Sequence, residues 1–258
     1  MKRRPTEEER KQMVVKANAL IQSSRYSLTL QQQRIILYAI SKVKPDDDPD
    51  TWYEMDLRDM CKVCGIDLDS GGTYYGVLKD NLNALLQRRW GVTPDGGHAS
   101  ISWLGDVETN AGDTKIRLRF NYFMAPYLFR LRAFYTQYPL EAVLAFHSTY
   151  SIRLYELLIS YSYKNKLDQY VSQDITVDLL VLRKCLDVNG YARWVDFDRF
   201  VLAKAVAEIN TYSPDIHVSY TTRKTGRSVS AVVFTVEQPT PIAALTASRN
   251  RREELDGY

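Results

Sequence analysis

The stretch DFDRFVLAKAVAEINTYSPDIHVSYTTRKTGRSVSAVVFTV, residues 196–236, passes from a helical pattern directly into a hairpin pattern. In its first part, apolar side chains recur at the spacing of one helix face, at Leu202, Ala205, Val206 and Ile209. In its second part, two alternating runs, 216–220 and 229–236, flank the segment TTRKTGRS, as two antiparallel strands around a turn would. The stretch therefore predicts a helix followed by a β-hairpin.

Two further helices are expected before this one. FHSTYSIRLYELLISYSY, from residue 146, predicts a long helix, and TVDLLVLRKCL, from residue 176, predicts a short one. Helices joined by a short connection, the last of them leading into a hairpin, describe a winged helix-turn-helix. Residues 139–237 are accordingly expected to form one winged-helix domain.

The first half of the chain repeats this order. LTLQQQRIILYAISKV (28–43), LRDMCKVCG (57–65) and GGTYYGVLKDNLNALLQRRW (71–90) predict three helices, and ASISWLGDV (99–107) with TKIRLRF (114–120) predicts a hairpin. Arg34 aligns with Arg153, Asp56 with Asp178, and Leu78 with Leu202, at offsets that rise slowly from 119 to 124. The predicted fold is thus α+β, with two tandem winged-helix domains related by internal duplication.

The second unit carries the residues expected to bind DNA. In a winged helix the last helix enters the major groove, and the hairpin lies along the backbone or the minor groove. The helix face opposite the apolar one, together with the hairpin tip, supplies the candidate contacts: Arg193, Arg199, Phe200, Ala203, Lys204, Ala207, Arg223, Lys224 and Arg227. For the helix, the alternative is an alanine-rich surface helix with Phe200 packed on the hairpin. For the hairpin tip, the alternative is a solvated turn.

The first unit offers weaker candidates of the same kind. Tyr75 and Lys79 are expected on the outward face of its last helix. In TKIRLRF, the cations Lys115, Arg117 and Arg119 alternate with apolar residues, so we expect a buried face and a cationic face on this strand.

Composition excludes several classes of protein. The chain has 258 residues, with 45% hydrophobic and 25% charged residues, and a net charge of only +3. Attraction to a polyanion must therefore come from local clustering of cations. No apolar run approaches the roughly 20 residues of a membrane span, and MKRRPTEEERKQ lacks the apolar core of a secretion signal. We expect a cytoplasmic bacterial protein without membrane association.

The cysteine pair CKVC, Cys61 and Cys64, could indicate a zinc or redox site. A structural zinc site needs four ligands, and the only other cysteine is Cys185. We interpret the pair as small apolar residues one helical turn apart, and expect no metal and no cofactor.

Several stretches resemble one family, the replication initiators of iteron-containing theta-replicating plasmids, which are Rep proteins with two winged helices. These stretches are VVKANALIQSSRYSLTLQQQRIILYAI, FHSTYSIRLYELL, DFDRFVLAKAVAEIN and GRSVSAVVFTV, and they span roughly residues 14–237. The resemblance implies binding to tandem origin repeats as a monomer, dimerisation through the N-terminal domain, autorepression as a dimer, recruitment of the host replication initiator and helicase, and no catalytic site.

Residues 1–25 are charged at first and then mixed, which favours an N-terminal arm with room for a short helix. Residues 26–138 are expected to be a winged-helix domain, for which the resemblance implies dimerisation and DNA backbone contact. Residues 139–237 are expected to be the main sequence-specific DNA-binding domain. Residues 238–258 lie outside the match, and we expect a disordered tail.

Two rival functions remain open at this point. A transcriptional repressor with two winged helices and no initiator role would have the same sequence features. A tyrosine-dependent origin-nicking enzyme is less favoured, because His98, His147 and His217 are far apart in sequence and Tyr155 and Tyr161 resemble core residues on amphipathic helices. The absence of a GxxxxGK[ST] motif argues against an ATPase.

Overall fold

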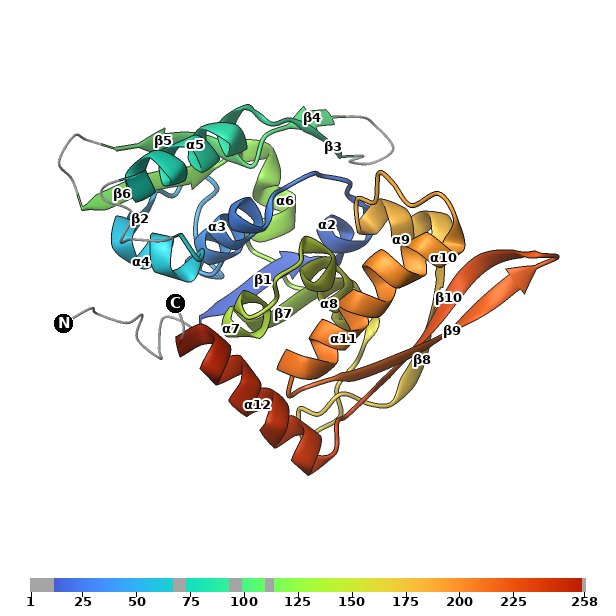
Figure 1. The fold of residues 1–258 in the computed structure, drawn as a ribbon. Helices are drawn as coiled ribbons and strands as arrows, with labels where there is room; N and C mark the ends of the chain where they lie inside the picture. Colours follow the sequence, from blue (N-terminus) through green and yellow to red (C-terminus); the bar gives the residue numbers. More distant parts are fainter. Residues whose placement is uncertain (1–11, 67–72, 93–98, 110–113, 257–258) are drawn as a thin grey trace. The chain divides into compact units, whose positions relative to one another are not determined.

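The computed structural model describes residues 12–66, 73–92, 99–109 and 114–256, and the chain divides into two compact units (Figure 1). The described residues of unit 1 lie in 12–20 and 26–144, and those of unit 2 in 21–25 and 145–256. Each unit combines helices with a three-stranded antiparallel sheet. This composition confirms the α+β prediction.

Unit 1 is centred on three helices and one sheet. The helices are α3 (Leu30–Ile40), α4 (Leu57–Val63) and α5 (Thr73–Gln87). In the sheet, β6 (Lys115–Phe120) lies between β2 (Tyr53–Asp56) and β5 (Leu104–Glu108). Around these lie the paired strands β1 (Met13–Ala17) and β7 (Tyr135–Pro139), the paired strands β3 (Trp90–Val92) and β4 (Ala99–Ile101), and the short helices η2 (Tyr122–Met124), α6 (Ala125–Leu128) and α7 (Glu141–Leu144).

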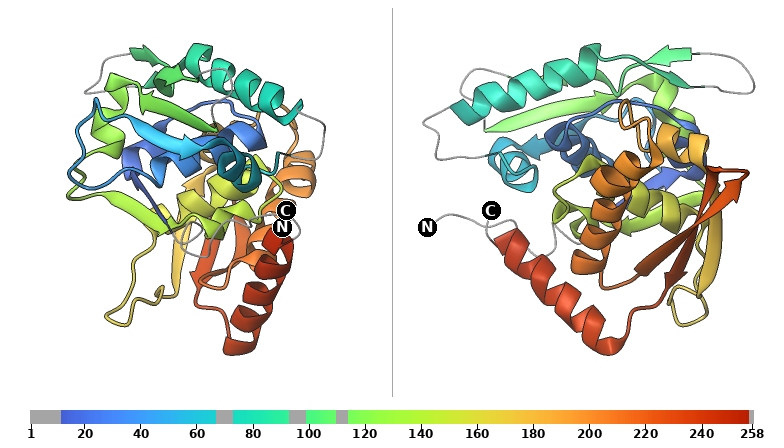
Figure 2. Two further views of the ribbon diagram at one scale, coloured as in Figure 1. Left: turned by 90° about the vertical axis from the view of Figure 1, so that its left-hand side faces the viewer. Right: turned by 45° about the vertical axis from the view of Figure 1, so that its right-hand side comes forward.

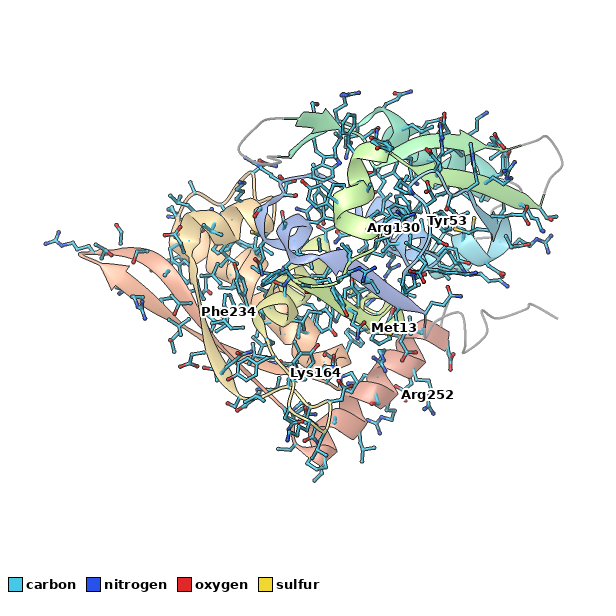
Figure 3. The ribbon with its side chains drawn as sticks, turned by 180° about the vertical axis from the view of Figure 1, so that it is seen from behind. Met13, Tyr53, Arg130, Lys164, Phe234 and Arg252 are labelled. Carbon is cyan, nitrogen blue, oxygen red and sulfur yellow. The ribbon has the colours of Figure 1, made fainter. Side chains whose placement is uncertain are left out.

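Unit 2 has the same plan. Its helices are α8 (Thr149–Tyr161), α9 (Leu179–Cys185) and a continuous helical stretch made of α10 (Trp194–Phe197), η3 (Asp198–Leu202) and α11 (Ala203–Tyr212). In its sheet, β10 (Ser228–Glu237) lies between β8 (Gln173–Asp178) and β9 (His217–Thr225). Phe234 of β10, labelled in Figure 3, is fully buried, as are Phe197 and Leu202 of the helical stretch.

The internal duplication holds at the level of individual hydrogen bonds. Arg34 on α3 donates from Nη1 to the carbonyl of Cys64 at 3.5 Å, and Arg153 on α8 donates from Nη1 to the carbonyl of Cys185 at 3.3 Å. Both arginines are buried. In each unit the buried guanidinium thus ties the long helix to the end of the following short helix.

The N-terminal arm is a correction, because part of it belongs to the fold. Residues 1–11 lie outside the described part of the chain, but β1 pairs along its whole length with β7, from Met13↔Pro139 to Ala17↔Tyr135. The helix α2 (Asn18–Ser23) then begins in unit 1 and ends in unit 2. Pairing with a strand more than a hundred residues away is a tertiary contact that local patterns do not reveal. The boundary between the units also lies at 144/145 rather than 138/139.

The expected disordered tail is a second correction. Residues Pro241–Asp256 form a helix, α12, which packs against α11 (Figure 2). Its Ala247 and Leu255 are buried, and the Nδ2 of Asn250 donates to the carbonyl of Thr211 at 3.2 Å. Thr240 and Pro241 are typical of the start of a helix. The Thr240 hydroxyl accepts from the N–H of Ala243 at 3.3 Å, and proline suits the first helical position.

Two smaller differences concern single elements. TVD of the expected second helix belongs to β8, and α9 starts at Leu179 because Asp178 caps it. The expected strand at 99–107 is split into β4 and β5, of which β4 pairs with β3. Among the described residues, no helix has both the length and the apolar character that crossing a bilayer requires.

Candidate nucleic-acid interface

The helical stretch 194–212 presents the two faces that its sequence predicts. Its buried side chains include Leu202, Ala205, Val206 and Ile209. The side chains of Arg199, Phe200, Ala203, Lys204 and Ala207 are exposed on the opposite face. The outer face therefore combines two cations and an aromatic ring with small side chains that allow close approach of the backbone.

The middle part of this stretch, η3, is a π-helix. The N–H of Ala203 donates to the carbonyl of Asp198, five residues earlier. Single π-turns within helices are frequent at functional sites. In this wider turn Val201 and Leu202 are buried, and Arg199 and Phe200 are exposed, so the buried and exposed faces of the helix continue through η3.

The hairpin of β9 and β10 ends in the cationic tip. The strands pair from His217↔Glu237 to Thr225↔Ser228, and Gly226 and Arg227 form the turn between them. Gly226 has φ +62°, a left-handed conformation that glycine adopts without steric cost. All residues from 221 to 228 are exposed, including Arg223, Lys224 and Arg227.

Two side-chain contacts fix the hairpin against the helical stretch. The Tyr220 hydroxyl on β9 donates to Oδ1 of Asp198 at 2.6 Å. Burial and the neighbouring Asp198 carboxylate raise the pKa of Tyr220, so its hydroxyl remains a donor at neutral pH. At the other end, the Asn210 amide donates to the carbonyl of Val218 and accepts from its N–H, both at 2.8 Å. These hydrogen bonds hold the base of the hairpin against the helical stretch, so the helix face and the hairpin lie next to each other.

The cations of this surface differ in their partners. Among the described residues, Arg199, Lys204, Arg223, Lys224 and Arg227 form no ion pair with a carboxylate. Arg193, by contrast, pairs bidentately with Asp196, at 2.7 and 3.0 Å. The guanidinium holds the pKa of Asp196 below its usual value. The charge of Arg193 is thus shared, and Arg199 also lowers the pKa of Asp196 through its charge, whereas Lys204 and the three cations of the hairpin tip present uncompensated charge.

Phe200 packs on a residue that the sequence reasoning did not single out. Its ring stacks on Tyr191, with centroids 5.6 Å apart and an interplanar angle of 26°. This stacking partner lies in the turn before α10 and not on the hairpin. Tyr191 lies in the turn between α9 and α10, and nothing in the local pattern distinguishes it from an ordinary loop residue. Its left-handed backbone, φ 55°, arises from tertiary contacts of the turn.

In unit 1, the structure places Lys79 on the exposed face of α5 and Tyr75 half-buried on the same helix. The β6 strand requires a correction, because its outer face is mixed in charge rather than cationic. Lys115 pairs with Glu54, and Arg117 with Glu108 at 2.9 Å. Arg119 pairs with Asp106 at 2.5 Å and with Asp50 at 3.3 Å. The two arginines also lie over the Trp52 ring. Three of these carboxylates come from the neighbouring strands β2 and β5, and Asp50 comes from the turn before β2, so they depend on tertiary register that the local pattern of β6 does not show.

Of the other chemical candidates, the two cysteines and Tyr155 lie in the core, whereas Tyr161, His147 and His217 are partly exposed. Cys61 and Cys64 are both fully buried free thiols, which confirms their interpretation as apolar residues. Burial raises the pKa of Cys61 to about 12. Tyr155 is fully buried and donates to Asp215 at 2.7 Å, but Tyr161 is 43% exposed and is not a core residue, because it is the last residue of α8. His98 lies outside the described residues, and within them no cluster of three metal-ligating side chains occurs.

Comparison with known proteins gives two family matches, a curated relative and a similar solved structure. Residues 13–159 match the family described as Initiator Replication protein, WH1, and residues 179–236 match Initiator Rep protein, WH2. A replication initiation protein of Escherichia coli is 26% identical over 251 residues, which cover 95% of this chain and 76% of that protein. The crystal structure of the Pi initiator protein in complex with iteron DNA has a TM-score of 0.69 at 19% identity, covering 90% of this chain and 99% of that one.

These matches agree with the geometry. The Pi initiator shares the fold. The WH1 match covers unit 1 and continues into α8 of unit 2, and the WH2 match lies within unit 2. With winged-helix matches over most of its length, the chain belongs to the initiator replication protein family.

Proposed function

We propose that this protein is a plasmid replication initiator that binds double-stranded DNA sequence-specifically at direct repeats of an origin. One observation carries the proposal: the exposed face of η3 and α11 is joined by a hydrogen bond to a hairpin whose tip carries cations without a carboxylate partner among the described residues. Family membership and the iteron DNA bound by the Pi initiator support the same function.

In this proposal, α11 enters the major groove. Ala203 and Ala207 allow the helix backbone to approach the base edges, and Lys204 and Arg199 reach guanine acceptors or phosphates. The hairpin tip lies on the adjacent backbone or minor groove, where Arg223, Lys224 and Arg227 meet phosphates. Arg193 makes a weaker phosphate contact, because it must share its charge with Asp196.

Unit 1 contributes a second, weaker DNA contact through Tyr75 and Lys79. Lys115, Arg117 and Arg119 would have to leave their carboxylates to bind phosphates, so we expect their removal to weaken binding less than removal of hairpin cations. Comparing Lys79→Ala with Lys115→Ala in a DNA titration tests this order. A larger loss for Lys115→Ala would show that the outer face of β6 binds DNA.

The proposed assembly has two exclusive states. A monomer grips one direct repeat with both units, in major grooves about 34 Å apart. A dimer formed through unit 1 grips an inverted repeat with residues 139–237 and represses its own gene. Sedimentation on one direct and one inverted repeat tests the assembly, and two chains per site on both DNAs would contradict it.

We further propose that the protein works in the bacterial cytoplasm, recruits the host replication initiator and helicase, and has no catalytic activity of its own.

Selection of duplexes from a random library with the full chain, followed by footprinting on the origin region of the parent plasmid, tests the function. The proposal predicts one enriched sequence that recurs in tandem at the origin. A single palindromic site without tandem copies would instead favour a dedicated repressor. Metal-dependent nicking of supercoiled origin DNA would favour the nicking enzyme.

A further inference from the structure

An exposed aromatic pair stands at the start of the helix face that would enter the major groove. Phe200 and Tyr191 are 41% and 42% exposed and stack on each other. The Arg199 guanidinium carbon and the Lys204 Nζ lie 5.4 and 5.7 Å from the centroid of the Phe200 ring. At this point the helix face therefore combines two partly exposed aromatic rings with two cations.

The turn that carries Tyr191 is braced from two sides. Arg183 of α9 donates from Nη2 to the carbonyl of Tyr191 at 2.8 Å and from Nη1 to that of Gly190 at 3.3 Å. Arg25 donates from Nε to Asp187 at 3.1 Å and also contacts Asn189. The left-handed conformation of Tyr191, φ 55°, costs about 1–2 kcal/mol in a residue with a side chain. These contacts hold it, so Tyr191 supports the Phe200 ring from a fixed position.

The chemistry of the major groove limits what this ring can recognise. Base pairs present donors and acceptors there, and the one methyl group among them is the C5-methyl of thymine. An aromatic ring does not replace the hydrogen bonds that these donors and acceptors make with water, whereas burial of the methyl group against the ring is favourable because it removes apolar surface from water. The flanking Arg199 and Lys204 provide charge complementarity to the DNA around it.

We infer that Phe200, held in place by Tyr191, forms an apolar subsite for a thymine C5-methyl group in the DNA that α11 reads. This inference rests on the proposed function and adds a base identity to it. Phe200 is the contacting residue, and Tyr191 is a positioning residue. Lys204 and the hairpin cations then contribute to affinity independently of this methyl group.

The test uses the full chain and a duplex that it has selected from a random library. Each thymine is replaced singly by deoxyuridine, which removes the methyl group and leaves the hydrogen-bonding pattern intact, and affinity is measured by fluorescence anisotropy. The wild type should lose about fourfold at one thymine position, the factor that corresponds to burial of one methyl group. Phe200→Ala should bind thymine and uracil equally at that position, while Phe200→Leu should keep part of the preference.

The remaining variants separate positioning from folding. Tyr191→Ala should reduce the thymine preference without changing the salt dependence of binding, and Tyr191→Phe should retain the preference because it keeps the ring. Tyr163→Ala removes another exposed aromatic side chain of unit 2 and should leave the preference as in the wild type.

Three results would overturn the inference. If the wild type shows no loss at any thymine, or if Phe200→Ala keeps the wild-type preference, the subsite does not exist, although sequence-specific binding stands. If the wild type enriches no sequence from the library, the proposed function itself fails and the subsite fails with it.

Discussion

Asp56 and Asp178 make the same two hydrogen bonds, 122 residues apart in the chain. The Oδ1 of Asp56 accepts from the N–H groups of Arg58 and Asp59 at 2.8 and 3.2 Å, and the Oδ1 of Asp178 accepts from those of Leu180 and Val181 at the same distances. Each aspartate ends the first strand of its sheet and caps the following short helix. The duplication has thus retained a capping interaction that begins the helix-turn-helix in both units.

Removing either cap should destabilise its own unit. We predict that Asp56→Ala and Asp178→Ala each lower the free energy of unfolding by about 1 kcal/mol, and that the asparagine variants cost only a few tenths, because asparagine also caps well. Urea unfolding monitored by hydrogen exchange in α4 and α9 measures both effects. If the alanine and asparagine variants lower the free energy of unfolding equally, the capping hydrogen bonds of the aspartates do not stabilise the two helices.

The buried thiols should be inert in the folded protein. Burial raises the pKa of Cys61 from 9.0 to about 12 and also raises those of Cys64 and Cys185, so the reactive thiolate is scarce. We predict slow alkylation by iodoacetamide at pH 8 and fast alkylation in urea. Because the folded state keeps these protons longer than the unfolded state, stability should fall as the pH rises from 9 to 12. Fast alkylation of Cys61 in the native protein would contradict its burial.

The hairpin tip should act through charge alone. Replacing Lys224 and Arg227 together with alanine should weaken binding to selected and shuffled duplexes alike, and the slope of log K against log salt should flatten by about 0.9 for each lost phosphate contact. The matched control is Arg249→Ala with Arg252→Ala, which removes two cations from the exposed side of α12 (Arg252 is labelled in Figure 3). An unchanged slope in the hairpin double variant would remove the hairpin tip from the interface, and the α12 control should leave the slope as in the wild type.

Docking of α12 should depend on one of its two leucines. Leu255 is 6% exposed and Leu245 is 72% exposed, and His147 joins the helix to α11 by contacting Glu254 at 2.8 Å and Glu208 at 3.1 Å. We predict that Leu255→Ala costs about 2 kcal/mol, whereas Leu245→Ala costs less than about 0.5 kcal/mol. Thermal unfolding with hydrogen exchange in residues 241–256 compares them. Equal costs would mean that α12 does not pack through Leu255.

The sequence predicted what local periodicity controls. The helix faces of α11, the hairpin around Gly226 and the order of elements in both units follow from patterns that repeat within a few residues. Local patterns did not predict which side chains contact one another across the fold. Three of the carboxylates that pair with the β6 cations come from neighbouring strands, and the pairing of β1 with β7 joins distant segments. The stacking of Tyr191 on Phe200 depends on a turn held by Arg183, which no spacing rule encodes.

The most direct test of the account compares Lys204→Ala with wild type on a selected duplex and on its shuffled sequence, at one fixed salt concentration. Lys204 lies exposed on the α11 face and forms no ion pair with a carboxylate of the described residues. If α11 reads base edges, the variant should lose about 1–3 kcal/mol of binding free energy on the selected duplex and much less on the shuffled one. Equal losses on both duplexes would contradict the assignment of Lys204 to base recognition, and with it the central claim that this face of α11 reads the sequence.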